Sequence, residues 1–381
     1  MEKLGRFKKL LIDRPEWGEL ATFVPNKGVP VYNWFYYKEG FSAELVIKLM
    51  DMFNLRRDAV VLDPFCGSGT TLLACKQRSI ESIGYDVLPI SVFASYVKTR
   101  EYHTEKLKIA AQDLLKKRFE KPKPGDAPAI MYRAFSKYAL DDVFFFKQRI
   151  AEIADEDTKC FFLLALVKAA LSVSYAWKDG AVIKIKKKHS PPLRFMLKRI
   201  IRKMIKDLEQ TAHQKTPLVE QCDARRMNAA DNSIDAIITS PPYLNQIDYT
   251  KVYAIEDFIV SGMRITAHPA VRSYIGLREE YNYLTTDVEL PDSSKPYFTD
   301  MNAVLEEMYR VCKHGAKVAI VVGNGFLENQ IVDSDLILAY LAEKFGFDVK
   351  NIFVLNKRYA LANRTEKKGL LRESLIIMEK K

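Results

Sequence analysis

The 381-residue chain has few cysteines and few histidines, and their positions exclude two common kinds of structural site. The five cysteines lie far apart and form no Cys-x-x-Cys pair, so we expect neither a disulfide framework nor a zinc site. The five histidines show no metal-ligand spacing, and we expect no metal. A reducing cytoplasm is the compartment that this cysteine usage favours.

The sequence also lacks a hydrophobic run long enough to cross a bilayer. The most apolar stretch, residues 161–177, contains Lys168 and is short for a membrane span, so it predicts a core helix. No signal peptide is recognisable, because only a three-residue apolar patch follows the first nine residues. Hydrophobic residues make up 48% of the chain, which is ample for a packed core. We therefore expect a soluble intracellular protein of two domains, or of one large domain with an insertion.

Positive charge is present in excess and is concentrated in one segment. Lys and Arg number 59 against 48 Asp and Glu, which gives a net charge of +11. Residues 184–206 carry ten basic side chains and no acidic one, so the rest of the chain is nearly neutral. Such a run predicts contact with the phosphates of a nucleic acid more than a merely solvated helix face. The residues that we expect to bind nucleic acid are Lys184, Lys186, Lys187, Lys188, Arg194, Lys198, Arg202 and Lys206.

The hydrophobic pattern divides the chain into three segments. Residues 1–100 and 215–381 contain short apolar strands that alternate with helices, which is typical of a mainly parallel sheet covered on both faces. Residues 101–214 lack that alternation and predict a mostly helical insertion, which includes the basic run. The apolar runs at 349–355 and 374–378 have no long helix between them, so we expect them to pair as an antiparallel edge.

A glycine-rich turn follows the predicted strand at residues 59–62 and has the sequence Asp63-Pro64-Phe65-Cys66-Gly67-Ser68-Gly69-Thr70. Its glycines let the backbone approach a ligand closely, and the next helix directs its positive end at that ligand. Asp86 ends the following strand, where it can accept hydrogen bonds from both hydroxyls of a ribose. The turn lacks the third glycine of a dinucleotide site and the Gly-Lys-Ser/Thr of a P-loop. Because Asp63 would repel a pyrophosphate but suit a cation, the pattern favours S-adenosylmethionine (SAM), which has an amino group, a sulfonium and a ribose.

A second motif, Thr239-Ser240-Pro241-Pro242-Tyr243, ends the predicted strand at residues 236–239. Two successive prolines fix the backbone, so a carbonyl and the Ser240 hydroxyl can accept hydrogen bonds from an exocyclic amine. Such bonds direct the lone pair of the amine towards a sulfonium methyl group. Tyr243 adds an aromatic face on which a base can stack. The motif therefore predicts direct methyl transfer to an amine, without a covalent enzyme intermediate.

Together the two motifs resemble those of the amino-methyltransferases of nucleic acids, specifically the cytosine-N4 group. Further similarity lies in the helix at 41–50, in Cys222-Asp223-Ala224-Arg225, in residues 305–324 and in residues 372–376. The resemblance implies a Rossmann-like, seven-stranded methyltransferase sheet with a helical, basic insertion. It implies SAM as cofactor, bound by Phe41, Ser42, Asp63, Phe65, Gly67, Ser68, Gly69, Thr70, Asp86 and Asp223. It implies a catalytic set of Ser240, Pro241, Pro242 and Tyr243.

The resemblance also implies that the target is the N4 amine of cytosine, since serine opens the second motif where adenine-N6 enzymes usually have aspartate. The target base must then be flipped out of a duplex or be single-stranded. The helical, basic insertion slightly favours structured RNA such as ribosomal RNA, and a site-specific DNA cytosine-N4 methyltransferase is the alternative. A non-catalytic nucleic-acid-binding protein with a relic fold is a more distant alternative, which the intact motifs disfavour. Scarce glutamine and abundant Lys, Glu and Tyr are typical of a thermophile.

Three other segments are candidates for the surroundings of the site. The aromatic run at residues 32–37 is expected to pack as a lid over the cofactor side, and stacking on bases is the alternative. The residues after the second motif are candidates to line the pocket or to form a polar loop; they are Asn245, Gln246, Asp248 and Tyr249. Residues 264–296 are loop-like and predict a second substrate-facing insertion.

Overall fold

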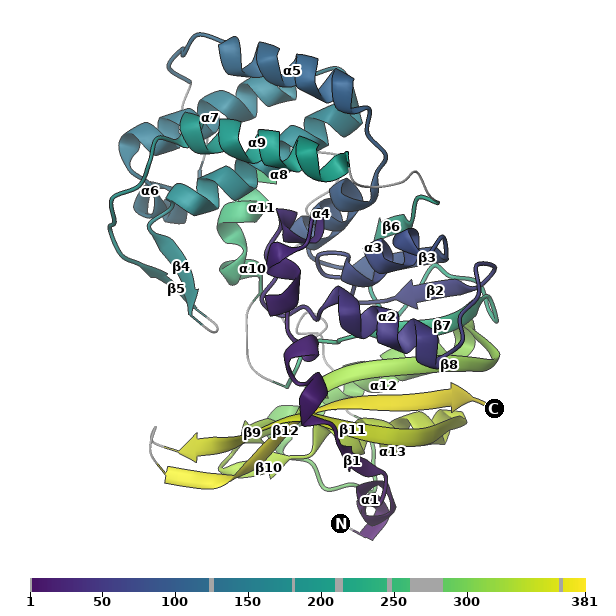
Figure 1. Ribbon diagram of the computed structural model, residues 1–381. Helices are drawn as coiled ribbons and strands as arrows, with labels where there is room; N and C mark the ends of the chain where they lie inside the picture. Colours follow the sequence, from purple (N-terminus) through teal and green to yellow (C-terminus); the bar gives the residue numbers. More distant parts are fainter. Residues whose placement is uncertain are drawn as a thin grey trace.

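The structure is a computed structural model that describes residues 2–122, 127–179, 182–209, 215–244, 249–260, 284–362 and 366–381. Figure 1 shows a twisted sheet with helices on its faces and a separate group of helices above one end of it. Asn245, Gln246 and Asp248 lie outside the described residues, as does the predicted loop up to residue 283. In the described part of the chain, no helix has the length and apolar character that a membrane crossing requires.

The main sheet has eight strands in the order β1-β11-β12-β8-β7-β2-β3-β6. Neighbouring strands from β6 to β8 pair in parallel, and their bounds are Leu218–Gln221 (β6), Glu81–Asp86 (β3), Val60–Asp63 (β2), Ile234–Thr239 (β7) and Cys312–Gly323 (β8). The long strands β11 (Phe347–Ala362) and β12 (Glu366–Lys380) pair antiparallel, which confirms the predicted pairing of the last two apolar runs. The chain therefore has the expected Rossmann-like methyltransferase sheet.

One strand of the main sheet was not predicted. The short strand β1 (Leu11–Asp13) adds to the edge of the sheet in parallel with β11. The strand has only three residues, two of which are exposed. So short a segment shows too little alternation of apolar and polar residues to predict a strand from the sequence. The sheet consequently has eight strands instead of seven, and the N-terminal segment covers the edge that β11 would otherwise leave open.

Alternate side chains of the strands pack into two separate hydrophobic clusters, one on each face. On β7, for example, Ala236 and Ile238 belong to the cluster that contains α2 and α3, whereas Ile237 belongs to the cluster that contains α12 and α13. This is the period-two alternation of a strand buried on both sides. The covering helices are α2 (Ala43–Met52) and α3 (Thr70–Gln77) on one face, and α1 (Glu2–Lys8), α12 (Lys295–Val311) and α13 (Ser334–Phe345) on the other.

The second group of helices forms a third hydrophobic cluster, to which α4 (Pro89–Thr99) and α11 (Ala254–Val260) also contribute. Its other helices are α5 (Thr104–Lys116), α6 (Ala129–Ala134), α7 (Lys137–Ala151), α8 (Glu156–Val173) and α9 (Leu193–Leu208). The predicted core helix corresponds to α8, which is buried along nearly its whole length but ends at Val173. The chain continues into a hairpin of β4 (Ala176–Asp179) and β5 (Val182–Ile185), so the last residues of the core helix expected at 161–177 lie in a strand instead.

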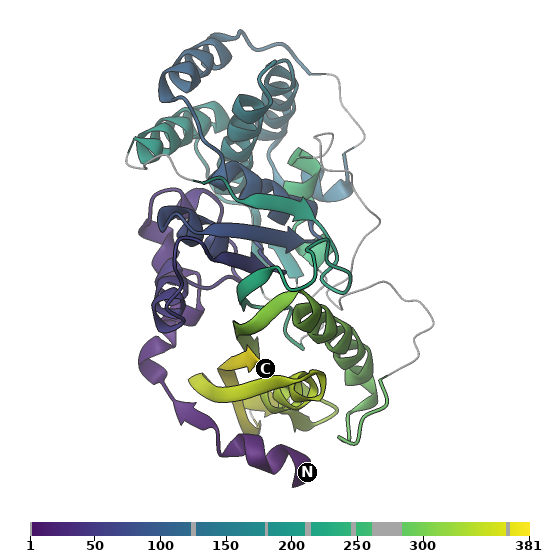
Figure 2. The same cartoon turned by 90° about the vertical axis from the view of Figure 1, so that its right-hand side faces the viewer.

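The remaining elements are short connections around the sheet. Figure 2 shows the N-terminal segment, in purple, running along one side of the molecule from the sheet towards the group of helices. This segment consists mainly of 3₁₀ turns at Pro15–Trp17 (η1), Glu19–Ala21 (η2), Val24–Gly28 (η3) and Tyr32–Trp34 (η4). The other short elements are Tyr249–Val252 (α10) and Asp292–Ser294 (η5), which lie between the second motif and α12, and Gly325–Leu327 (β9) and Gln330–Val332 (β10), which follow β8.

Candidate active site

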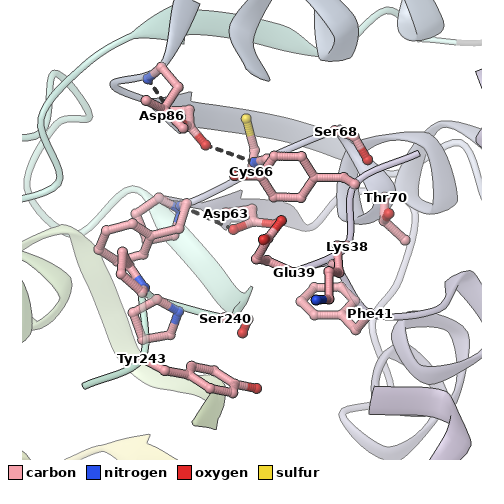
Figure 3. A pocket seen from close by; sticks show the side chains of 18 of the residues that line it. Lys38, Glu39, Phe41, Asp63, Cys66, Ser68, Thr70, Asp86, Ser240 and Tyr243 are labelled. Atoms are coloured by element: carbon pink, nitrogen blue, oxygen red, sulfur yellow. Dashed lines mark hydrogen bonds between the residues drawn. The ribbon is translucent and has the colours of Figure 1, made fainter. Parts of the chain in front are cut away.

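Both sequence motifs line one cavity, which opens at the carboxyl ends of β2, β3 and β7 (Figure 3). Figure 3 shows the labelled side chains arranged around this cavity, with Asp86 on the side away from Tyr243. The predicted residues that line it are Phe41, Asp63, Phe65, Gly67, Ser68, Thr70, Asp86, Ser240, Pro241, Pro242 and Tyr243. The sheet thus brings together two motifs that are far apart in the sequence, because parallel strands place their carboxyl ends at the same edge.

The glycine-rich turn needs both of its glycines. Gly67 and Gly69 have φ angles of 51° and 76°, in the left-handed region that side chains with a Cβ rarely adopt. A Cβ on Gly67 would lie 2.9 Å from the Tyr37 ring, and one on Gly69 would lie 2.8 Å from the Ser95 hydroxyl. Gly69 is also the N-cap of α3, so the free amides at the start of this helix lie next to the cavity.

Asp63 is a buried carboxylate beside the turn. Its Oδ1 accepts hydrogen bonds from the Thr239 hydroxyl at 2.6 Å and from the Phe65 amide at 3.2 Å. Burial raises the pKa of Asp63 to about 6, so the group is mostly ionised at neutral pH. No cationic side chain among the described residues pairs with Asp63. A buried anion beside a cavity fits a cationic ligand, such as the amino acid part of SAM.

Asp86 lies at the end of β3 and holds the turn in place. Its two oxygens accept hydrogen bonds from the Gly67 amide and the Leu88 amide, both at 2.9 Å. Burial is the main cause that raises the pKa of Asp86 to about 6. Each carboxylate oxygen has a second lone pair, so the group can still accept hydrogen bonds from two ribose hydroxyls. This donor and acceptor pattern also fits SAM.

Residues of α4 that belong to neither sequence motif support the turn from behind. The Ser95 hydroxyl donates to the Gly67 carbonyl at 2.8 Å, and the Lys98 ammonium donates to the Ser68 carbonyl at 2.5 Å. Burial lowers the pKa of Lys98 to about 7. The Ser68 hydroxyl is buried and has no hydrogen-bond partner within the described structure, which leaves it available to a ligand. No local motif marks Ser95 or Lys98, because helix packing alone brings them to the turn.

The side of the cavity away from Asp86 contains the Ser-Pro-Pro-Tyr motif and a carboxylate from β12. Ser240 lies on the cavity wall directly after β7. The Tyr243 hydroxyl donates a hydrogen bond to Glu373 Oε1 at 2.8 Å, and burial raises the pKa of Glu373. The Tyr243 ring packs over Gly323, where a Cβ would lie only 2.7 Å from the ring. Glu373 was not predicted as a site residue, although it falls in a segment that carried the family resemblance.

Three predicted cofactor residues are not among those that line the cavity: Gly69, which caps α3, and Ser42 and Asp223. The hydroxyl of Ser42 accepts a hydrogen bond from the Leu45 amide at 3.1 Å, which makes Ser42 the N-cap of α2. The carboxylate of Asp223 pairs with Arg225 at 2.7 Å, and Arg225 also pairs with Asp300. Burial alone would raise the pKa of Asp223, but the hydrogen bonds from Arg225 hold it below its usual value. The neighbours of Asp223, Cys222 and Ala224, are the lining residues at this position.

The aromatic run contributes one ring to the cavity. Tyr37 lines the cavity and stacks on Tyr253 with 5.3 Å between ring centroids and 17° between ring planes. Tyr32, Trp34 and Phe35 are buried in the core that the run shares with the group of helices. Lys38 and Glu39, directly after the run, also line the cavity and were not predicted.

Most of the predicted nucleic-acid-binding side chains are exposed on the group of helices. Lys198, Arg202 and Lys206 lie on the outer face of α9, opposite its buried apolar stripe. Lys184 and the lysines at 186–188 are exposed on β5 and just after it. Arg194 differs from them, because its guanidinium donates to the carbonyls of residues 115 and 117 at 3.1 and 3.2 Å. It also lies 4.9 Å from the centre of a buried aromatic ring and therefore supports helix packing.

Comparison with known proteins identifies relatives that match most of the chain. The family described as DNA methylase matches residues 22–90 and 234–381, which together are more than half of the chain. The type II methyltransferase M.BsoBI of Geobacillus stearothermophilus is 28% identical, over 95% of this chain and 88% of its own length. M.AvaI of a Nostoc species is 26% identical, over 88% of this chain and 83% of its own length. Among solved structures, geranyl diphosphate C-methyltransferase from Streptomyces coelicolor is 8% identical with a TM-score of 0.36, covering 89% of this chain and 80% of that one.

No group of acidic, histidine and cysteine side chains in the described ranges is placed to hold a metal ion.

Proposed function

The chain belongs to the DNA methylase family and uses SAM as its methyl donor, and we propose that it methylates the exocyclic N4 amine of cytosine in DNA. The observation that carries the proposal is the position of Ser240. It follows β7 at the wall of the same cavity that contains Asp63 and the glycine-rich turn. Serine at the start of this motif is typical of the cytosine-N4 group. The relatives are type II methyltransferases, so we infer action at a specific DNA site and favour DNA over the structured RNA that the sequence slightly favoured.

On the cofactor side, we assign roles from charge and hydrogen-bonding capacity. SAM supplies an electrophilic methyl group on a positively charged sulfur. The buried carboxylate of Asp63 offsets positive charge in the methionine part, and Asp86 accepts hydrogen bonds from the ribose. Glycine at positions 67 and 69 lets the turn adopt positive φ and pack closely against Tyr37 and Ser95, and this holds the backbone of Gly67 and Ser68 at the cavity.

On the target side, the motif holds the amine and the base separately. The Ser240 hydroxyl and the adjacent rigid carbonyl accept hydrogen bonds from the N4 amine, so its lone pair points at the methyl group. A nitrogen–carbon bond forms as the sulfur–carbon bond breaks, and the methylated amine then releases one proton to solvent. Tyr243 offers its ring to the base, and the Glu373 hydrogen bond and the close packing on Gly323 fix the ring orientation. We propose that the base is flipped into this cavity from the duplex.

Substitution of Ser240 tests this assignment directly. Ser240→Ala removes the hydroxyl acceptor, and we expect methyl transfer to genomic DNA to fall by about a hundredfold. SAM affinity, measured by calorimetry, should stay within about twofold of the wild type, because Asp63 and Asp86 are unchanged. Ser233→Ala is the matched control, since this half-buried serine precedes the opposite, amino end of β7 and its hydroxyl donates only to the nearby Ala230 carbonyl. Full activity of the Ser240 variant, or equal losses in both variants, would contradict the role assigned to Ser240.

A further inference from the structure

The β4–β5 hairpin has two faces of different chemistry. Trp177 pairs with Lys184 across the hairpin, and Asp179 pairs with Val182. All four of these side chains are exposed and, by the alternation of strands, lie on one face. The side chains of the intervening residues are less exposed and lie on the other face. We call the first of these the outer face and the second the inner face.

The inner face is anchored to the wall of the active site through Lys178. Its ammonium lies 2.6 Å from the carboxylate of Glu256, which is 1% exposed, and 3.2 Å from the centre of the Tyr253 ring. The Tyr253 hydroxyl donates to Glu39 at 2.7 Å, and its ring stacks on Tyr37. Because Glu39 and Tyr37 line the cavity, the hairpin is held at a fixed position beside the site of methyl transfer. In Figure 1 the hairpin leaves the group of helices and points towards the sheet.

The outer face has a composition that packing does not explain. Trp177 is 50% exposed and Val182 is 52% exposed. By contrast, Trp34 is fully buried and Trp17 packs against Phe353. The Lys184 ammonium lies 5.4 Å from the centre of the Trp177 ring and pairs with Asp179.

Positive charge continues directly from this face along the chain. The exposed lysines at 186–188 follow β5, and no acidic residue occurs from 184 to 206. The outer face and the residues that follow it therefore carry four lysines, Lys184 and those at 186–188, and one acidic side chain, Asp179. The combination of an exposed aromatic ring and adjacent cations is typical of surfaces that stack on bases and contact phosphates.

We propose that the outer face of the β4–β5 hairpin is a DNA-docking surface, on which Trp177 stacks against a base next to the flipped cytosine. Lys184 and the lysines at 186–188 contact the adjacent phosphates. A duplex that has lost one base from its stack exposes the faces of the neighbouring bases, and an aromatic ring covers such a face. This inference rests on the proposed function, because it takes DNA with a flipped base as the ligand.

Tryptophan fluorescence and affinity together test the hairpin. The probe is a duplex oligonucleotide of the methylated sequence with an abasic site at the target position, with SAM present. We expect Trp177→Ala to weaken binding of this duplex about tenfold, since stacking on an aromatic ring contributes roughly that much per base. Trp177→Phe should retain most of the affinity because it retains a ring. Binding should quench the fluorescence of the wild type but not that of the Trp177→Phe variant.

Trp17→Phe is the matched control, because Trp17 lies against the far strand β11. This variant should bind the duplex as the wild type does and should show the same quenching. SAM affinity should be unchanged in all variants. If the wild type methylates DNA but Trp177→Ala binds the duplex with unchanged affinity, the hairpin proposal is wrong and the proposed function stands. Quenching of Trp177 by RNA but not by the duplex would also overturn it, whereas a wild type that methylates no DNA would overturn the proposed function itself.

Discussion

Replacing Asp63 by asparagine is expected to stabilise the ligand-free protein and to weaken its binding of SAM strongly. The hydrogen bonds from Thr239 and Phe65 both end on Oδ1, so the single amide oxygen of an asparagine can keep them. The Thr71 hydroxyl also bonds to the carboxyl group and can accept from the new amide instead. The substitution therefore removes the buried charge and little else.

The pKa of Asp63 gives the size of the effect. Burial raises it from 3.8 to about 6, and one pKa unit corresponds to about 1.4 kcal/mol. Because the folded state binds the proton of Asp63 more tightly than the unfolded state does, proton binding stabilises the fold. This contribution is fully present below about pH 4 and is lost as the pH rises to about 6. Above pH 6 the ionised carboxylate thus costs the fold about 3 kcal/mol. For a chain of this length, about 3 kcal/mol corresponds to a change in Tm of roughly 4 °C.

The assay compares thermal melting of the wild type and Asp63→Asn without ligand between pH 4 and pH 8. We expect the variant to melt roughly 4 °C higher at pH 8, with an advantage that vanishes near pH 4. Calorimetry should show SAM binding weakened about a hundredfold or more, since a buried charge loses its partner. Asp51→Asn, an exposed control, should change neither quantity much. A variant that binds SAM normally, or that melts lower at pH 8, would refute the role given to the buried charge.

Three further predictions follow from the packing and the surface charge. Gly323→Ala places a Cβ 2.7 Å from the Tyr243 ring, so KM for DNA should rise several-fold with SAM affinity unchanged; Gly28→Ala, which meets no atom within 4 Å, should leave KM unaltered. Each phosphate contact contributes about 0.9 to the steepness of log DNA affinity against log salt concentration, so the triple variant Lys198→Gln/Arg202→Gln/Lys206→Gln should reduce this slope by about 2.7. An unchanged slope would show that the outer face of α9 does not touch DNA. Ser42→Ala removes the N-cap of α2 and should lower the free energy of unfolding by about 1 kcal/mol in denaturant titrations without changing SAM affinity. A large loss of SAM affinity in this variant would instead place Ser42 at the cofactor.

The parts of the site that the sequence predicts are those built from local chemistry. A turn with two glycines and a strand ending in Ser-Pro-Pro-Tyr each have a fixed local geometry, and parallel strands bring such ends to one edge. The pairing of β11 with β12 also follows from the pattern of neighbouring residues, and the structure contains it.

The parts that were missed depend on contacts between distant segments. Ser95, Lys98 and Glu373 reach the cavity wall or its turn through helix packing and strand order, which no local pattern encodes. Arg194 was grouped with the phosphate-binding cations because a sequence shows charge but not the carbonyls that a folded chain presents to it. The hairpin was missed for a related reason, since its alternating apolar residues merge into the basic run that predicted a helix face.

The identity of the methylated nucleoside tests the central proposal most directly. Purified protein would be incubated with labelled SAM and with genomic DNA and total ribosomal RNA in competition, and the digested nucleosides would be separated by mass spectrometry. We expect the label in N4-methyldeoxycytidine, and about a hundredfold less of it in the Ser240→Ala reaction. Label in N6-methyldeoxyadenosine would leave a DNA methylase but contradict cytosine as its target. Label in N4-methylcytidine from RNA would contradict DNA as the substrate.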